Sequence, residues 1–282
     1  MKVALVQLTS SDDPAENLTL VQEMIAQAVA GGAELVCTPE VTNCVSLDRA
    51  QQTAALHHQT DDPTLAALQV AAKNHAIWLS IGSLALKGGA DGRLVNRSFL
   101  IDPDGEISAT YDKIHMFDVQ VTEVETFAES TGFAPGDRAV LADARFAKLG
   151  LTICYDLRFP HLHRALAKAG AEILFVPAAF SPVTGAAHWE TLLRARAIET
   201  GCFVLAAAQT GIHKAKSGRS RETYGHSLAV TPWGEVIADA GTGTGVTIVE
   251  IDLREVSNCR KRIPALIHDR SFSGPDNNEP TD

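Results

Sequence analysis

The stretch KLGLTICYDLRFP, residues 148–160, contains the pattern of a buried strand followed by a turn before a helix. An apolar run typical of a buried strand stops at Cys154, a polar turn follows, and a helical pattern covers residues 161–169. A sharp strand-to-helix turn exposes its side chain at the edge of a sheet and leaves backbone N–H groups able to bind an oxyanion. The N-terminus of a helix also favours a thiolate over a thiol. Cys154 is therefore the candidate nucleophile.

The remaining cysteines lack such a setting. The chain has five cysteines, an odd number with no CxxC pair, so neither a disulfide framework nor a zinc ribbon is expected. The N-terminal apolar run is too short for a signal peptide, and no stretch approaches the roughly 20 apolar residues of a membrane span. We therefore expect a cytoplasmic protein in a reducing compartment. Four cysteines are expected to be structural: Cys37, Cys44, Cys202 and Cys259.

Outward from Cys154, strands and helices alternate. Apolar runs predict buried strands at residues 2–9, 34–38 and 77–85, and helical spacing predicts helices at 15–30 and 63–75. Continuous apolar strands indicate sheets that are covered on both faces, so the fold class is α/β, a layered sandwich in a single domain. Further strands are expected at 172–179, 202–209 and 245–253, hairpins at 95–112 and 225–241, and a helix at 188–200.

Two segments depart from this regular pattern. Residues 114–147 are rich in polar residues, glycine and proline, and we expect a long irregular loop there, which in a compact domain is often functional. Residues 271–282 are expected to form a flexible C-terminal tail, which leaves 1–270 as the folded domain.

Charged residues lie where two other predicted strands end. Glu40 follows the strand at 34–38, and Lys113 follows the segment SATYD. Active sites of layered α/β folds lie at strand ends of this kind. A thiol nucleophile needs a base for its proton, a cation or N–H donors for the oxyanion, and an acid for the leaving nitrogen. A carboxylate, an ammonium and a thiol at strand ends together supply these groups.

Three motifs carry a family resemblance. TPEVTN at 38–43, YDKIHMFD at 111–118 and CYDLRFP at 154–160 resemble, in this order, the motifs of the nitrilase (carbon–nitrogen hydrolase) superfamily. FAES at 127–130 resembles its second-glutamate motif, and the resemblance extends from residue 1 to about residue 270. It implies an α-β-β-α four-layer sandwich and a homodimer or a larger even assembly.

The resemblance also implies a catalytic group. Glu40 would act as the general base and acid, Lys113 would hold the oxyanion together with the backbone N–H of Tyr155, and Cys154 would attack an amide carbonyl. Glu129 would orient the lysine or the substrate amide. The implied enzyme is a cysteine-dependent amidase with a thioester intermediate.

The resemblance can be narrowed to a branch. AAAQTG at 206–211 and ETYGHS at 222–227 are more similar to the amidases that repair deaminated glutathione than to the ω-amidases. The latter usually carry Ser-Pro where this chain has Gln209 and Thr210, and a tryptophan in place of Tyr224. The implied reaction converts deaminated glutathione to 2-oxoglutarate and cysteinylglycine.

Such a substrate carries carboxylates, so the pocket needs a cation. Arg158, four residues after the nucleophile, is the candidate, and a structural pairing with Asp156 is the alternative. Arg194 and Arg196 lie on a helix that often meets a partner subunit in this family. The basic segment HKAKSGRSR at 213–221 is either a mobile loop beside the pocket or a solvated one.

Several sites and functions are set aside. The chain has 34 acidic and 24 basic residues, and its net charge of −10 disfavours a nucleic-acid surface. The histidine pairs at 57–58 and at 161 and 163 lack metal-site spacing, and GTGTG at 241–245 lacks the strand–turn–helix setting of a dinucleotide site. No metal or cofactor is therefore expected.

Alternative functions remain open. One is an ω-amidase that acts on 2-oxoglutaramate, and another is a hydrolase of N-carbamoyl amino acids. A non-catalytic scaffold on the same fold is a more distant possibility, which the four filled catalytic positions argue against. A papain-like Cys/His hydrolase is disfavoured because its signature around the cysteine and a suitable histidine partner are missing.

Overall fold

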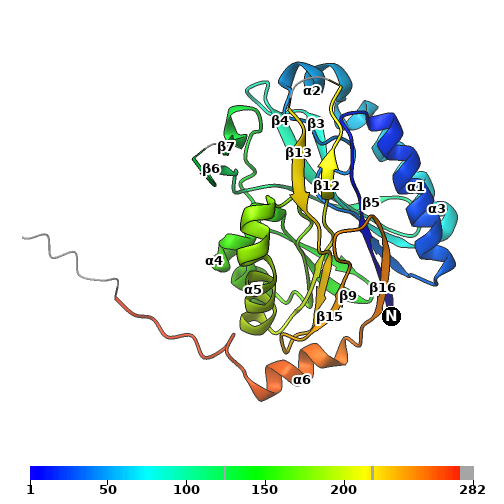
Figure 1. The fold of residues 1–282 in the computed structure, drawn as a ribbon. Helices are drawn as coiled ribbons and strands as arrows, with labels where there is room; N and C mark the ends of the chain where they lie inside the picture. Colours follow the sequence, from blue (N-terminus) through cyan, green and yellow to red (C-terminus); the bar gives the residue numbers. More distant parts are fainter. Residues whose placement is uncertain (124, 217–218, 274–282) are drawn as a thin grey trace, which may run out of the picture.

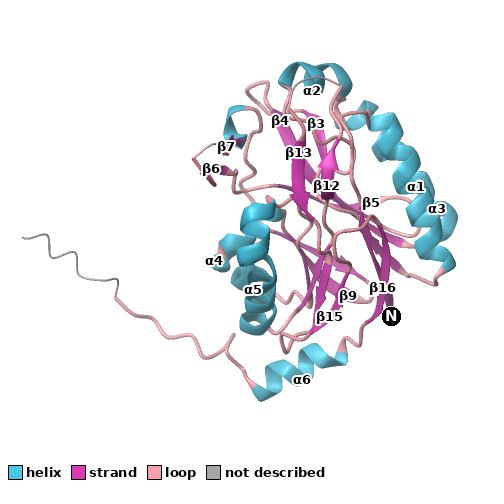
Figure 2. Cartoon of the chain, viewed as in Figure 1, coloured by secondary structure: helices cyan, strands magenta, loops and turns pink. Residues whose placement is uncertain are grey.

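The computed structural model describes residues 1–123, 125–216 and 219–273 of the 282-residue chain. Two six-stranded sheets form its centre (Figures 1 and 2). The first has the order β16-β1-β2-β3-β4-β5 and is parallel over β1, β2 and β3. Its strands are β1 (Lys2–Gln7), β2 (Leu35–Cys37), β3 (Trp78–Lys87), β4 (Leu94–Ile101), β5 (Ile107–Asp112) and β16 (Gly245–Glu250).

The second sheet has the order β15-β14-β11-β10-β9-β8 and is parallel over β9, β10 and β11. In both sheets antiparallel strands extend the parallel centre, so each sheet is mixed. Its strands are β8 (Val140–Ala144), β9 (Ala147–Leu151), β10 (Ile173–Phe175), β11 (Phe203–Ala206), β14 (Leu228–Val230) and β15 (Val236–Asp239).

The side-chain alternation of β1 divides the core into layers. Val3 and Leu5 belong to the cluster shared with the second sheet, whereas Ala4 and Val6 belong to a cluster formed with α1 (Pro14–Ala30) and α3 (Pro63–His75). This follows from the period of two in a strand, which sends successive side chains to opposite faces. Both faces of the central strands are therefore buried, as their continuous apolar sequences predict.

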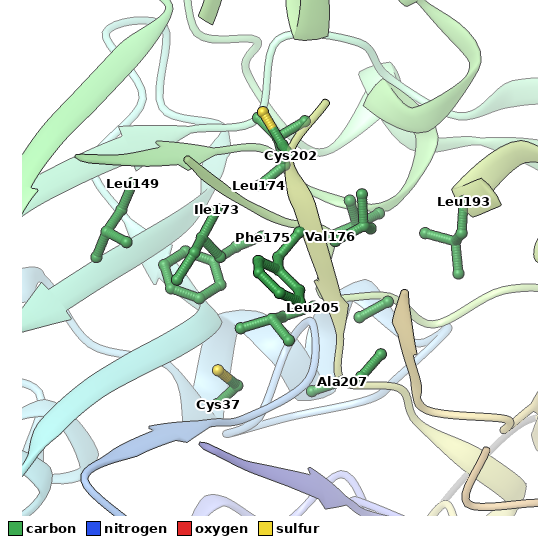
Figure 3. Close-up of a cluster of buried hydrophobic side chains, with 14 of the residues drawn as sticks. Cys37, Leu149, Ile173, Leu174, Phe175, Val176, Leu193, Cys202, Leu205 and Ala207 are labelled. Carbon is green, nitrogen blue, oxygen red and sulfur yellow. The ribbon is translucent and has the colours of Figure 1, made fainter. Parts of the chain in front are cut away.

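The inner cluster joins the two sheets. Figure 3 shows part of it, with Cys37 from β2 and with Phe175 and Leu205 from the second sheet. On the outer face of the second sheet lie α4 (Pro160–Lys168) and α5 (Pro182–Thr200), opposite the side that α1 and α3 cover (Figure 1). The four layers are helix, sheet, sheet and helix, and the predicted α-β-β-α sandwich in one α/β domain is confirmed.

The two helices predicted in the first layer agree closely with the structure. Asp13 caps α1 by accepting a hydrogen bond from the N–H of Ala15, and Asp62 caps α3 in the same way through Leu65. Each helix has a proline in its first turn, where the missing N–H has no intrahelical partner to lose. A third helix, α5, begins six residues before its predicted start at residue 188, again on a proline.

The prediction of an irregular segment at 114–147 was wrong in part. It contains the short hairpin of β6 (Asp118–Gln120) and β7 (Thr126–Ala128), the 3-10 helix η2 (Glu129–Thr131) and strand β8. The strands of this hairpin have no buried residues, so no apolar pattern in the sequence predicts them. Other elements that the sequence analysis did not identify are α2 (Arg49–Ala55), η1 (Gln59–Asp61), the ribbon of β12 (Thr210–His213) and β13 (Arg221–Tyr224), and α6 (Arg254–Arg262).

Residues 271–273 have no regular secondary structure, and 274–282, the rest of the expected tail, lie outside the described residues. Within the described ranges, none of the helices is both long enough and apolar enough to cross a bilayer.

Candidate active site

A cavity of about 300 Å³ collects the ends of several strands. Glu40 follows β2, Lys113 follows β5 directly, and Cys154 follows β9. All three line the cavity, and so does Glu129, the first residue of η2. Its wall also contains four phenylalanines, Phe117, Phe127, Phe133 and Phe180, and two arginines, Arg49 and Arg221. A volume of this size suits a small molecule.

Cys154 lies on a strained turn. It is the first residue of the 3-10 helix η3 (Cys154–Arg158) and has a φ of 51°, in the left-handed region that non-glycine residues rarely adopt. Its N–H donates to the carbonyl of Pro177 at 2.9 Å, which ties the turn to the end of β10. The N–H of Tyr155 lies in the first turn of η3, where helical N–H groups have no partner within the helix. This arrangement presents the thiol beside an N–H donor.

Glu40 is held by hydrogen bonds on both carboxylate oxygens. Its Oε1 accepts from Lys113 Nζ and from Asn96 Nδ2, each at 2.9 Å, and its Oε2 accepts from the N–H of Ala179 at 2.9 Å. The Cys154 thiol also forms a hydrogen bond with this carboxylate. Glu40 therefore adjoins both the thiol that it would deprotonate and the ammonium that would stabilise the oxyanion.

A second carboxylate completes the group around Lys113. Glu129 receives hydrogen bonds from Lys113 Nζ at 3.0 Å on Oε1 and 2.9 Å on Oε2. The N–H of Phe117 donates to Glu129 Oε2 at 2.7 Å. The ammonium thus lies between two carboxylates, almost entirely shielded from solvent. Such an arrangement fixes the position of Nζ, because an ammonium shared by two acids cannot move toward one without weakening the other.

The electrostatics define the resting protonation state. Burial alone would raise the pKa of Glu40, but the charge and hydrogen bond of Lys113 lower this pKa below its ordinary value. Burial and the Glu40 carboxylate raise the pKa of the Cys154 thiol well above its ordinary value, against the charge of Lys113. Burial would lower the pKa of Lys113, but the two carboxylates raise it above its ordinary value. The group therefore rests as a neutral thiol, a carboxylate base and an ammonium.

A buried aspartate connects the turn at Cys154 to the segment that carries Lys113. Asp156 accepts hydrogen bonds from the N–H of Ile153 at 2.8 Å and from the hydroxyl of Tyr111 at 2.6 Å. Its other oxygen lies 2.7 Å from Nδ1 of His115 and accepts from the N–H of that residue. Because Tyr111 and His115 flank Lys113 on either side, Asp156 fixes the distance between the thiol turn and the ammonium.

Comparison with known proteins identifies the family of the chain. The model of the carbon–nitrogen hydrolase family matches residues 2–261. The chain belongs to this family. The deaminated glutathione amidase of Yersinia enterocolitica is 40% identical over 276 residues, which are 96% of this chain and 93% of the relative.

Solved structures of the family share its fold. The Caenorhabditis elegans NitFhit protein superimposes with a TM-score of 0.86 at 38% identity, over 95% of this chain and 65% of that one. A glutamate-to-glutamine mutant of the amidase from Nesterenkonia sp. AN1 has a TM-score of 0.75 at 26% identity, over 93% of this chain and 94% of that one. That structure shows covalent addition of the acetamide moiety of fluoroacetamide at the active-site cysteine. The present protein is accordingly a carbon–nitrogen hydrolase of the amidase class that acts on linear amides.

Arg158 is not among the residues that line the cavity of this hydrolase, although it adjoins two aromatic residues that do. Its guanidinium lies 3.3 Å from Nδ1 of His188 on α5 and over the rings of Tyr155 and Phe180. The alternative pairing with Asp156 is not formed either. Asp156 bonds instead to two backbone N–H groups and to the side chains of Tyr111 and His115. The tight turn of η3 directs residue 158 toward α5, so closeness to the nucleophile in sequence does not bring this side chain into the pocket.

The arginines of α5 have structural contacts. Arg196 donates from Nε and Nη2 to the carbonyl of Leu157 at 3.0 and 2.7 Å, so it supports the end of η3 from behind. Arg194 donates to the carbonyl of Gly234 at 2.9 Å.

Besides Lys113, the cavity contains two arginines, which lie on elements that the sequence analysis did not predict. Arg49 opens α2, and its guanidinium lies 5.0 Å from the ring centre of Phe133. Arg221 opens β13, and its Nη2 donates to the carbonyl of Ala179 at 2.6 Å. Only Arg221 was indicated in advance, as the last residue of the basic segment 213–221. Within the described ranges, no group of three or more His, Cys, Asp and Glu side chains is arranged to hold a metal ion.

Proposed function

We propose that the enzyme hydrolyses deaminated glutathione to 2-oxoglutarate and cysteinylglycine. The observation that carries the proposal is a buried thiol, ammonium and two carboxylates in one cavity whose wall also contains two arginines. An amide substrate with a carboxylate at each end needs both features. Relatives that are 39–40% identical over nearly the whole chain and named deaminated glutathione amidases support this substrate.

In the proposed mechanism the first half forms a thioester. Glu40 takes the proton of the Cys154 thiol while the sulfur attacks the amide carbonyl carbon. The negative charge on the carbonyl oxygen is stabilised by the Lys113 ammonium and the N–H of Tyr155. Glu40 then gives its proton to the leaving nitrogen, the C–N bond breaks, and cysteinylglycine departs.

The second half hydrolyses the thioester. Glu40 removes a proton from a water molecule, the resulting hydroxide attacks the thioester carbonyl, and the same donors hold the second oxyanion. The thiolate leaves and recovers its proton from Glu40. In this scheme Glu129 acts as a positioning residue through Lys113, because it touches both the ammonium and the backbone of Phe117. The cysteine adduct of the Nesterenkonia amidase supports the covalent step.

The ω-amidase reaction is the second candidate, because 2-oxoglutaramate carries the same acyl half as deaminated glutathione. A panel of deaminated glutathione, 2-oxoglutaramate and an N-carbamoyl amino acid separates the candidates, with 2-oxoglutarate and ammonia as readouts. We expect the highest kcat/KM on deaminated glutathione and no turnover of any substrate by Cys154→Ala. A preference of wild type for 2-oxoglutaramate or the carbamoyl compound would reject the proposed substrate, and normal turnover by Cys154→Ala would reject the mechanism.

We also propose a cytoplasmic location and an even homo-oligomer. All five cysteines are free and buried, which suits a reducing compartment. Val183 and Ile198 on α5 are more than half exposed, and such apolar residues on one helix suit contact with a second copy. Light scattering coupled to size-exclusion chromatography tests the assembly, and a strict monomer would refute it.

A further inference from the structure

The cavity contains two arginines that make no direct contact with a carboxylate in the part of the chain that the structure describes. Within the described ranges, neither Arg49 nor Arg221 forms an ion pair. Six other arginines do pair with carboxylates: Arg93, Arg97, Arg164, Arg194, Arg196 and Arg254. Guanidinium groups without a direct carboxylate partner in the wall of a cavity are available to an anionic ligand.

Arg221 also has a buried donor without an acceptor. Its Nη2 donates to the carbonyl of Ala179, but its Nε has no partner and is shielded from solvent. A buried donor left unpaired is costly, and such groups in native proteins require an explanation. Because this Nε is shielded from the cavity as well, a carboxylate bound there would interact with Arg221 through the charge of the guanidinium.

The two arginines adjoin different parts of the catalytic group. Arg221 contacts the carbonyl of Ala179, whose N–H donates to Glu40, and its charge helps to lower the pKa of Glu40. Arg49 instead interacts electrostatically with Glu129 and lies against the backbone of Gly132, where a side chain would collide with the guanidinium. One arginine is thus on the side of the general acid, and the other is on the side of the second glutamate.

The chemistry of the reaction orients the substrate between them. The leaving nitrogen must lie beside Glu40, because Glu40 gives it a proton. The leaving half of a γ-glutamyl-like amide is a dipeptide, whose two residues reach about 7 Å when extended and end in a carboxylate. The acyl half extends in the other direction and also ends in a carboxylate.

We propose, on the basis of the function proposed above, that Arg221 binds the carboxylate of the leaving dipeptide and that Arg49 binds the carboxylate of the acyl half. The cavity thereby selects amides that are anionic at both ends. Arg221 is the residue that distinguishes deaminated glutathione from 2-oxoglutaramate, which has the same acyl half but releases only ammonia.

Kinetics of matched variants on these two substrates test the inference. We expect Arg221→Met to lower kcat/KM on deaminated glutathione by about 10–100-fold, the range for a lost charged hydrogen bond, and to leave 2-oxoglutaramate within about threefold. We expect Arg49→Met to lower both by about 10–100-fold. Measurements at pH 8, far above the ordinary pKa of a glutamate, minimise the contribution of Arg221 to the ionisation of Glu40.

Controls separate binding from folding. Arg254→Met, which removes an exposed guanidinium paired with Asp252, should leave both substrates unchanged. Arg221→Lys keeps the charge and should recover part of the lost rate, and circular dichroism spectra should match wild type.

The outcomes also separate this inference from the proposed function. If the wild-type enzyme does not cleave deaminated glutathione, both the proposed function and this inference are rejected. A wild-type enzyme that cleaves deaminated glutathione, with Arg221→Met equal to wild type or equally impaired on both substrates, rejects the inference alone.

Discussion

Replacement of Lys113 by methionine tests how charge is balanced in the site. The ammonium bonds to Glu40 at 2.9 Å and to Glu129 at 2.9 and 3.0 Å, with its side chain 2% exposed. Its removal leaves two acids facing each other without a cation. Breaking a buried ion pair in this way costs about 3–5 kcal/mol, which for a domain of this size corresponds to a Tm lower by on the order of 10 °C. Loss of one oxyanion donor lowers kcat by about 10²–10³-fold.

The penalty in this variant depends on pH. In wild type the pKa of Glu40 is lowered, so its contribution to stability is present above the pKa of the unfolded chain and is lost only as pH falls through the folded value. Without Lys113, burial and the neighbouring carboxylate raise the pKa of Glu40 instead. The folded variant then binds more protons than the unfolded chain, so its stability falls as pH rises. Thermal unfolding at pH 5.5 and pH 8 should show the larger deficit at pH 8.

A second substitution separates stability from catalysis. In the double variant Lys113→Met with Glu129→Gln, one carboxylate becomes a neutral amide, so most of the lost stability should return. Activity should stay at the level of the single variant, because the oxyanion still lacks its ammonium. A single variant as stable as wild type at pH 8, or a double variant that regains activity, would refute this account of the charges.

The remaining predictions concern how Glu40 is positioned and ionised. A Cβ added at Gly82 would lie 2.5 Å from the carbonyl oxygen of Pro39, so Gly82→Ala should displace the neighbouring Glu40. We expect the free energy of unfolding in urea to fall by about 1–3 kcal/mol and kcat to fall as well. An unchanged kcat would contradict the role of this close contact. Asn96→Ala removes a hydrogen-bond donor that lies 2.9 Å from Glu40, so the pKa of Glu40 should rise. The acidic limb of the pH profile of kcat/KM should then move to higher pH. An unshifted limb would argue against Glu40 as the base.

That the candidate reacting groups lie together could be predicted because their sequence signals are local. Glu40 and Cys154 each follow a run of apolar residues, and such runs become buried strands whichever partners they find. Lys113 follows the second strand of a predicted hairpin, in which only Tyr111 is buried. The four layers follow from strands that are apolar on both faces together with amphipathic helices such as α1. Glu129 lacked such a signal, because it follows a three-residue strand without buried side chains, and it was predicted only from the family motif.

The positions of the two arginines in the cavity could not be predicted for a physical reason. Arg49 opens a seven-residue helix and Arg221 opens a four-residue strand, and such short elements carry no periodicity that distinguishes them from loops. Their convergence depends on tertiary packing between segments far apart in the chain. Arg158 was chosen because it is close to Cys154 in sequence, but the backbone of η3 turns its side chain toward α5.

The most direct test of the account is to identify the atom that carries the acyl group. Turnover of deaminated glutathione is quenched in acid, and the protein is digested and mapped by mass spectrometry. The cavity is lined by two thiols, those of Cys154 and Cys44, so the assignment is informative. We predict a 2-oxoglutaryl thioester on Cys154 that hydroxylamine removes. An acyl group on Cys44, or turnover with Cys154 unmodified at every time point, would contradict the mechanism.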